Sequence, residues 1–294
     1  MEVVAGPQQN PPRVSLISSA ELVPVNENDT KWQGGFTAKL DGHGGVNVFS
    51  VCPGDAETFD FEDYPGGVAT FKPYVLYATD KSSTFGNDYT EMYDRAQRKL
   101  QAGESSALEA ILWAGYSGAT NENPFLGDGA GDYATTNVAS GLACEGSLAT
   151  STISITASKV HEAFAVLEQK IGEVSASRGM VHIRPQAFHK LVELSVVRRE
   201  GNVWLSPMDN IVVPGRGYPG TGPTGQVVGA SEWMYGHPGI VQIRRGGIDR
   251  LGEKDLASQV NRYTNDHEVI VQRVAHVLLD PTAQVFAIEF DALT

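Results

Sequence analysis

The sequence predicts an α+β fold, in which one long helix and an α/β region are framed by segments of β structure. Residues 88–115 keep apolar side chains at helical spacing. Runs rich in β-branched and aromatic residues stand on both sides of this helix, at 46–79 and 266–290. Between residues 156 and 214, helix-like and strand-like runs alternate, which is typical of an α/β layer.

Composition indicates a soluble chain with a sizeable core. The 294 residues are 41% hydrophobic, and the charged fraction is 19%, below the usual quarter or so. Because charged surface keeps a monomer soluble, this deficit favours a surface that other chains cover. A loop-rich, Ser/Thr-rich protein explains the same composition. The length suits one large domain or two modest ones.

The net charge of −13 is unevenly distributed. Residues 1–150 hold 8 Lys and Arg against 20 Asp and Glu, and residues 151–294 hold 14 against 15. Sequence-independent binding of nucleic acid needs positive charge, so a simple DNA-binding protein is excluded. An acidic wall around packed DNA fits this charge, since it would repel the DNA.

Other sequence signals argue against a membrane or metal protein. No signal peptide is visible, and no window approaches the 18 apolar residues of a membrane span. Cys52 and Cys144 lie far apart without zinc-ligand spacing, so we expect free thiols or one disulfide. We therefore expect a chain that is made in, and stays in, a cytoplasm.

The first 34 residues read as an extended arm. Prolines bias the backbone toward extended conformations, and no helical period is present: Pro7, Pro11, Pro12 and Pro24. The segment cannot bury its own apolar residues, so we expect it to be disordered or to lie along a body. That body is the chain's own or a neighbour's.

Residues 36–84 read as strands separated by a long two-stranded excursion. Its tip is acidic, with five carboxylates in the segment 55–63: Asp55, Glu57, Asp60, Glu62 and Asp63. Their spacing does not match a calcium-binding loop. A solvated acidic loop is the default interpretation.

The long helix is expected to bury one stripe of residues and to end at Gly115. The stripe consists of Met92, Ala96, Leu100, Gly103, Ala107 and Ile111. Gly103 permits a bend. The following segment, 116–152, is nearly all small, polar or glycine, which is uncommon unless it binds something or lines an interface.

The second half is expected to hold two helices and several short strands. A helix over 156–172 ends at Gly172, and a strand, a proline and a second helix follow over 178–194. Two short strands follow over 202–214, and two more over 231–245 on either side of a turn at His237, Pro238 and Gly239. A long hairpin with its turn at 280–283 closes the chain over 263–294.

One motif needs an explicit test as a nucleotide site. Gly215, Gly217 and Gly220 have the G-x-G-x-x-G spacing of a dinucleotide loop. Pro219 and Pro223 break any helix after them, so a pyrophosphate has no helix N-terminus to bind. We expect instead a loop whose backbone passes very close to another segment. One candidate for that segment is the same loop in symmetry-related copies.

Other candidate chemistry is equally weak. His182 reads as a packed strand residue rather than a catalytic base. We expect no catalytic, cofactor-binding or metal-binding residues and no cofactor. A basic stretch is either a solvated face or a partner for the acidic segment 55–63 of another subunit: Arg244, Arg245, Arg250, Lys254 and Arg262.

The order of these elements resembles the tailed-bacteriophage major capsid fold, which encapsulins share. Three stretches are similar to capsid proteins of phages that infect actinobacteria: LQAGESSALEAILWAG, AFAVLEQKIGEVSASRGMVHIRPQAF, and IVVPGRGYPG followed by SEWMYGHPGIVQI. The resemblance covers residues 30–294. No propeptide or scaffolding segment is evident.

This resemblance implies a domain plan. It consists of an N-terminal arm (1–34), an extended loop with the first peripheral strands (35–85), a spine helix with the peripheral domain (86–150), an axial domain (151–262) and a closing β hairpin of the peripheral domain (263–294). Loops of the axial domain, including Gly215–Gly225, would then meet around five-fold and six-fold axes.

The function that the resemblance implies is structural. The chain would assemble as hexamers and pentamers into an icosahedral phage head that encloses double-stranded DNA without sequence-specific binding. Its partners would be itself, a portal and scaffolding proteins, and its place the virion capsid, assembled in the host cytoplasm. The alternatives are an encapsulin-like compartment and a nucleotide-binding enzyme that uses the Gly215–Gly220 loop.

Overall fold

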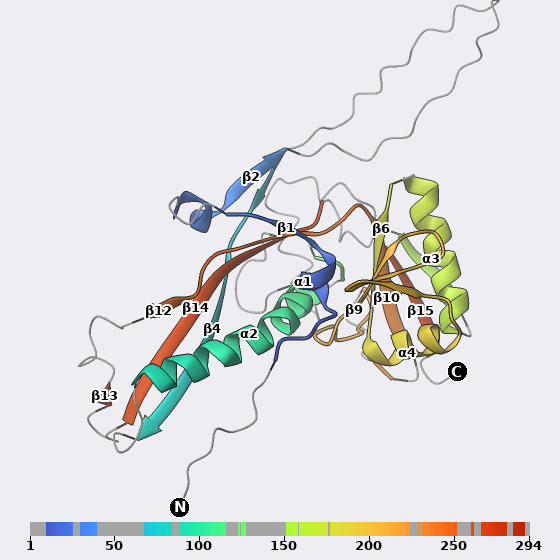
Figure 1. Ribbon diagram of the computed structural model, residues 1–294. Helices are drawn as coiled ribbons and strands as arrows, with labels where there is room; N and C mark the ends of the chain where they lie inside the picture. Colours follow the sequence, from blue (N-terminus) through green and yellow to red (C-terminus); the bar gives the residue numbers. More distant parts are fainter. Residues whose placement is uncertain are drawn as a thin grey trace, which may run out of the picture.

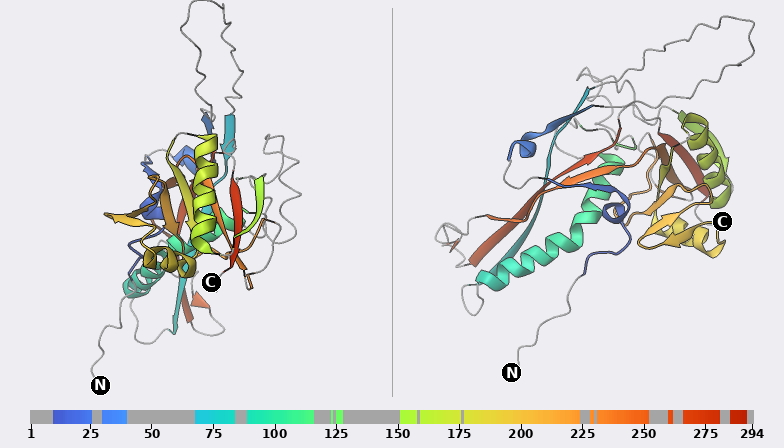
Figure 2. Two further views of the ribbon diagram at one scale, coloured as in Figure 1. Left: turned by 90° about the vertical axis from the view of Figure 1, so that its right-hand side faces the viewer. Right: turned by 45° about the horizontal axis from the view of Figure 1, so that its top comes forward.

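The computed structural model describes residues 10–25, 30–39, 68–83, 89–115, 123, 125–127, 151–157, 159–175, 177–223, 228–229, 231–251, 260–261, 266–280 and 285–291. These residues form an elongated body in which two β-sheets stand side by side (Figures 1 and 2). The acidic segment 55–63, Cys52, Cys144, Lys254, Arg262 and most of 116–150 lie outside the described residues.

The first sheet is built around one long strand. Its members are β1 (Glu21–Val23), β4 (Tyr74–Ser83), β11 (Gln242–Arg245), β12 (Asp249–Leu251), β13 (Val260–Asn261) and β14 (Asp266–Leu278). Strand β14 pairs antiparallel with β4 along one edge and with β11, β12 and β13 along the other. Helix α2 (Tyr89–Ala114) lies along this sheet (Figure 1).

The second sheet has seven strands and is mixed. Its order is β5 (Ser151–Ala157), β15 (Phe286–Asp291), β10 (Ser231–Pro238), β6 (Gly179–Ile183), β9 (Ile211–Pro214), β8 (Val203–Leu205) and β7 (Arg198–Glu200). Helices α3 (Val160–Val174) and α4 (Pro185–Glu193) bury Phe164, Leu167 and Leu191 against one face of it.

Small elements near the N-terminus complete the body. They are α1 (Leu16–Ser19), the 3-10 turn η1 (Thr30–Gly34) and a two-stranded ladder of β2 (Phe36–Lys39) and β3 (Val68–Phe71). Strand β1 runs parallel to β11 at the edge of the first sheet. The described part of the arm therefore lies along the body of its own chain. This was one of the two expected placements, the other being the body of a neighbouring copy.

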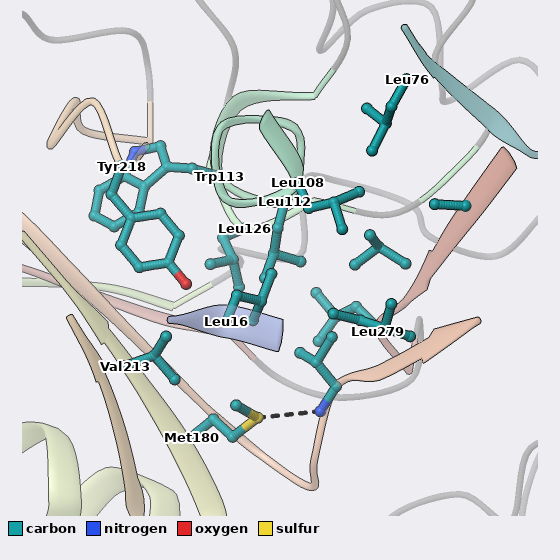
Figure 3. Packing of buried hydrophobic residues seen from close by; sticks show 14 of the residues in the cluster. Leu16, Leu76, Leu108, Leu112, Trp113, Leu126, Met180, Val213, Tyr218 and Leu279 are labelled. Carbon is teal, nitrogen blue, oxygen red and sulfur yellow. Dashed lines mark hydrogen bonds between the residues drawn. The ribbon is translucent and has the colours of Figure 1, made fainter. Parts of the chain in front are cut away.

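One hydrophobic core joins the two sheets. It contains Leu76 of β4, Val271 of β14 and Leu112 of α2, together with Val213 and Tyr235 of the second sheet. Figure 3 shows its centre, where the side chain of Leu16 in α1 lies beside those of Leu112 in α2 and Leu126 in the segment that follows. The backbone N–H of Val241, the residue before β11, donates to the sulfur of Met180 in β6 of the second sheet.

Most of the expected helices and strands are confirmed. Helix α2 spans Tyr89–Ala114 and ends at Gly115, whose φ of +75° lies in the left-handed region typical of a helix C-terminus. Helix α3 differs from the expected range 156–172 at both ends. It begins at Val160, because residues up to Ala157 belong to β5, and it continues past Gly172 to Val174. No helix in the described part of the chain is long and apolar enough to cross a membrane.

The closing hairpin expected over 263–294 does not form. Strand β14 belongs to the first sheet, whereas β15 pairs with β10 and β5 in the second. Both apolar strands of the expected hairpin form, but each of them pairs with strands that are distant in the sequence. The connection between these strands therefore passes from one sheet to the other.

The buried stripe of α2 also differs from the expected one. It continues in steps of four beyond Leu100, through Glu104, Leu108 and Leu112, whereas Gly103 is exposed. The carboxylate of Glu104 is only 3% exposed, and it pairs with Arg273 (2.5 Å) and Arg245 (3.3 Å). A charged residue on the buried face hid the true period from the sequence pattern.

Candidate functional site

Among the described residues, one of the two faces of the first sheet is largely uncovered. Helix α2 packs against the face that carries Leu76 and Val271. The opposite face exposes four large apolar side chains, which we call the uncovered face: Tyr77 (69% exposed), Val75 (54%), Leu251 (40%) and Ile270 (38%).

The strand register gathers these four residues. Leu251 and Ile270 are directly opposite in the β12–β14 ladder, and Ile270 is opposite Thr79 in the β14–β4 ladder. Tyr77 and Val75 follow on β4 at the two-residue spacing that keeps side chains on one face. Eight large apolar side chains are exposed in the described part of the chain, and half of them lie here. Such a concentration is typical of an interaction surface.

The loop 215–220 passes directly against α2 of the same chain. A β-carbon on Gly217 would lie 1.9 Å from the carbonyl oxygen of Ser106, so only glycine fits. Gly220 has φ of +77°, which also favours glycine. The expected close approach is confirmed, but the neighbour that requires glycine is the chain's own helix. Because α2 occupies this place, a nucleotide phosphate has no room against Gly217.

A buried carboxylate holds three segments together at this point. Glu109 of α2 is 1% exposed and accepts the N–H of Gly217 (2.9 Å), the N–H of Leu16 (3.0 Å) and the hydroxyl of Ser105 (3.0 Å). Burial raises the pKa of Glu109, and these hydrogen bonds oppose the rise. We call Glu109, its partners and the loop 215–220 the junction, because the N-terminal segment, helix α2 and the loop that follows β9 meet there.

His182 of β6 contacts the junction through Tyr218 and is fully buried. Its Nδ1 is 2.7 Å from the hydroxyl of Tyr218, and its Nε2 is 3.0 Å from Nε2 of His237. The interpretation of His182 as a packed strand residue is therefore confirmed. A base with no exposed surface does not reach a substrate, which removes the support for the enzyme alternative.

The basic stretch is only partly described, and its described members are engaged within the chain. Arg245 pairs with the buried Glu104, and Arg250 pairs with Asp94 at 3.4 Å. These two arginines hold the first sheet to α2. The pairing of this stretch with the acidic segment 55–63 of another subunit stays a prediction, because that segment lies outside the described residues.

Comparison with solved structures identifies the fold. The chain is similar to the capsid of an empty GTA particle (TM-score 0.51, 13% identity), with 99% of this chain and 94% of that chain covered. It is also similar to the SrpI encapsulin of Synechococcus elongatus, with a TM-score of 0.52 and 12% identity, and the match covers 99% of this chain and 94% of that chain. A structure of Mycobacterium phage Adephagia matches with a TM-score of 0.51 and 12% identity, and the match covers 98% of this chain and 92% of that chain.

The chain has the phage capsid fold. The likeness extends over nearly the whole chain, which agrees with the fold expected from the order of its elements. No family model and no curated protein matches the chain in sequence. At identities of 12–13%, the likeness to these structures is one of fold.

Two features of the site were missed in the sequence. Glu109 was not singled out, because an isolated glutamate on a long helix reads as a solvated residue. Tyr77 and its neighbours were expected as strand residues, but alternation does not reveal which face of a sheet stays uncovered. The exposed Glu91 and the buried Glu109 of α2 have no distinguishing local pattern.

Proposed function

We propose that this chain is the subunit of a closed shell built from many copies of itself, and that the shell is a phage head enclosing double-stranded DNA. The observation that supports this most strongly is the likeness to capsid and encapsulin structures across nearly the whole chain. In this proposal the copies form hexamers and pentamers, a portal and scaffolding proteins are further partners, and assembly takes place in the host cytoplasm.

The uncovered face gives this proposal a physical basis. Burying Tyr77, Val75, Leu251 and Ile270 on a neighbouring copy removes apolar surface from water, at about 25 cal/mol for each Å². A repeated contact of this kind on every copy produces a lattice, provided that the symmetry closes. The net charge of −13 suits a wall that leaves packed DNA unattached.

An encapsulin-like compartment is the second candidate, favoured by the match to the SrpI encapsulin. The contents of purified particles separate the two. Nuclease-resistant double-stranded DNA in particles from an infected host supports the phage head. A packaged enzyme without DNA supports the compartment.

The substitution Tyr77→Asp is expected to block particle formation while the chain still folds. Tyr77 is 69% exposed in the single chain, so the change costs that chain about 1 kcal/mol or less. In an interface the same carboxylate is buried without a partner, which costs several kcal/mol at each contact. Size-exclusion chromatography and electron microscopy measure the result.

The matched control is Tyr77→Phe, which keeps the ring and removes only the hydroxyl. It is expected to form particles as the wild type does. Normal particles from Tyr77→Asp would contradict the assignment of this face to assembly.

A further inference from the structure

The buried pair His182–His237 is the centre of a hydrogen-bond chain whose protons can be placed. His237 Nδ1 lies 3.0 Å from the carbonyl oxygen of Pro238, which only accepts, so this nitrogen carries a proton. His237 Nε2 is then bare and accepts from His182 Nε2–H. His182 Nδ1 is bare in turn and accepts from the Tyr218 hydroxyl. Every contact holds one proton, and both rings are neutral.

This series of hydrogen bonds has no favourable position for one more proton. A proton on His237 Nε2 would face the N–H of His182 across 3.0 Å. A proton on His182 Nδ1 would force the Tyr218 hydroxyl to turn its own proton away from the bond. Either addition puts a positive charge on a ring that is at most 1% exposed.

In the described part of the chain, the groups that hydrogen-bond to the pair, the Tyr218 hydroxyl and the Pro238 carbonyl, carry no charge that would offset it. His237 of β10 faces His182 of β6, and its own charge would lower the pKa of His182 further below the range that burial already sets. Tyr218 of the loop 215–220 faces them from the other side, and burial and the charge of Glu109 raise its pKa well above its ordinary value. Beyond Tyr218 lies Glu109 of α2. Burial raises its pKa, so its titration acts in the opposite sense, because acid relieves the cost of that buried charge.

We propose that the His182–His237 pair is an acid-sensitive latch of the junction, and that mild acid releases the loop 215–220 and the N-terminal segment while both sheets stay folded. The latch and the segments are connected through adjacent residues. Tyr218 bonds to His182, and its neighbour Gly217 donates to Glu109, which also holds Leu16. Loss of the Tyr218 contact therefore loosens the site that anchors α1.

The direction of the effect follows from proton linkage. The ordinary pKa of histidine is about 6.5, and the folded-state pKa of His182 lies below it. The stability that the latch provides is therefore complete above about pH 6.5 and is lost as the pH falls from there toward the folded-state value. Each proton taken up on opening changes the opening equilibrium by about tenfold for each pH unit.

Hydrogen–deuterium exchange of the unassembled full-length chain tests the proposal at about pH 7.5 and about pH 5.5, on either side of the histidine value. Protection factors, corrected for the intrinsic exchange rate, are compared between the junction and the β14–β4 ladder. We expect protection of the amides of Leu16 and Gly217 to fall by about tenfold. The amides of Val271 and its neighbours in the ladder should keep theirs.

Two variants assign the effect to the pair. In the double variant His182→Gln with His237→Gln, neither side chain titrates, and the junction should show the same protection at both pH values. His189 is an exposed histidine on α4, and His189→Gln should behave as the wild type does.

Several results would overturn the latch. They are unchanged wild-type protection at Leu16 and Gly217, a parallel loss in the β14–β4 ladder, and an equal loss in the double variant. The wild-type comparison decides the question even if the double variant does not fold. Since all of these groups belong to one chain, the result does not depend on shell formation.

Discussion

Replacing Gly217 by alanine is expected to lower the free energy of unfolding by about 3 kcal/mol or more. The added β-carbon would lie 1.9 Å from the carbonyl oxygen of Ser106 and 3.0 Å from the β-carbon of Glu109. Helix backbone cannot yield by such a distance, so the loop must move away. That movement also breaks the hydrogen bond from the Gly217 N–H to Glu109, and a buried carboxylate loses a donor.

Urea denaturation followed by circular dichroism measures this loss, with Gly103→Ala as the matched control. Gly103 lies in α2, the helix that Gly217 contacts, and a β-carbon on Gly103 meets nothing within 4 Å. The control should therefore gain about 0.5–1 kcal/mol, because alanine favours a helix interior over glycine. If both variants unfold at the same urea concentration, the close packing of the loop against α2 is wrong.

Replacing Glu109 by alanine is expected to cost about 3 kcal/mol and to detach the N-terminal segment. The change leaves the N–H groups of Leu16 and Gly217 and the hydroxyl of Ser105 without their acceptor. Each buried donor left unsatisfied costs about 1–3 kcal/mol. Removal of a buried charge returns part of this cost, which keeps the net loss below the sum.

Denaturation and limited proteolysis together measure the Glu109 result. Protease sites in residues 10–25 should be cut faster in Glu109→Ala than in the wild type. Glu91→Ala removes an exposed glutamate from the first turn of the same helix, and it should change the stability by about 0.5 kcal/mol or less. An arm that stays as resistant in Glu109→Ala as in Glu91→Ala would refute the anchoring role of this carboxylate.

The sequence allowed the kinds of elements to be predicted better than their partners. Local periodicity located α2, α4 and β14, since apolar spacing and turn residues are properties of neighbouring positions. The hairpin over 263–294 was wrong because β14 pairs with β4, nearly 200 positions away, and such distant pairing leaves no local signature. The α2 stripe failed at Glu104 because its pairing with Arg273 is visible only in three dimensions.

The candidate site was only partly accessible from the sequence. The prolines in and after the glycine loop argued against a nucleotide site, and the close backbone approach was anticipated from glycine alone. Identifying Ser106 as the neighbour required the structure, as did the role of Glu109. The uncovered face around Tyr77 could not be found from the sequence, because its exposure depends on which side of the sheet α2 occupies.

Electron microscopy of the purified wild-type chain, with mass determination of the same sample, tests the central claim most directly. If copies of the chain cover the Tyr77 face of one another, the sample should contain closed shells of many subunits. A folded chain that remains a monomer or small oligomer at every concentration and salt, with Tyr77 accessible to solvent, would contradict the account.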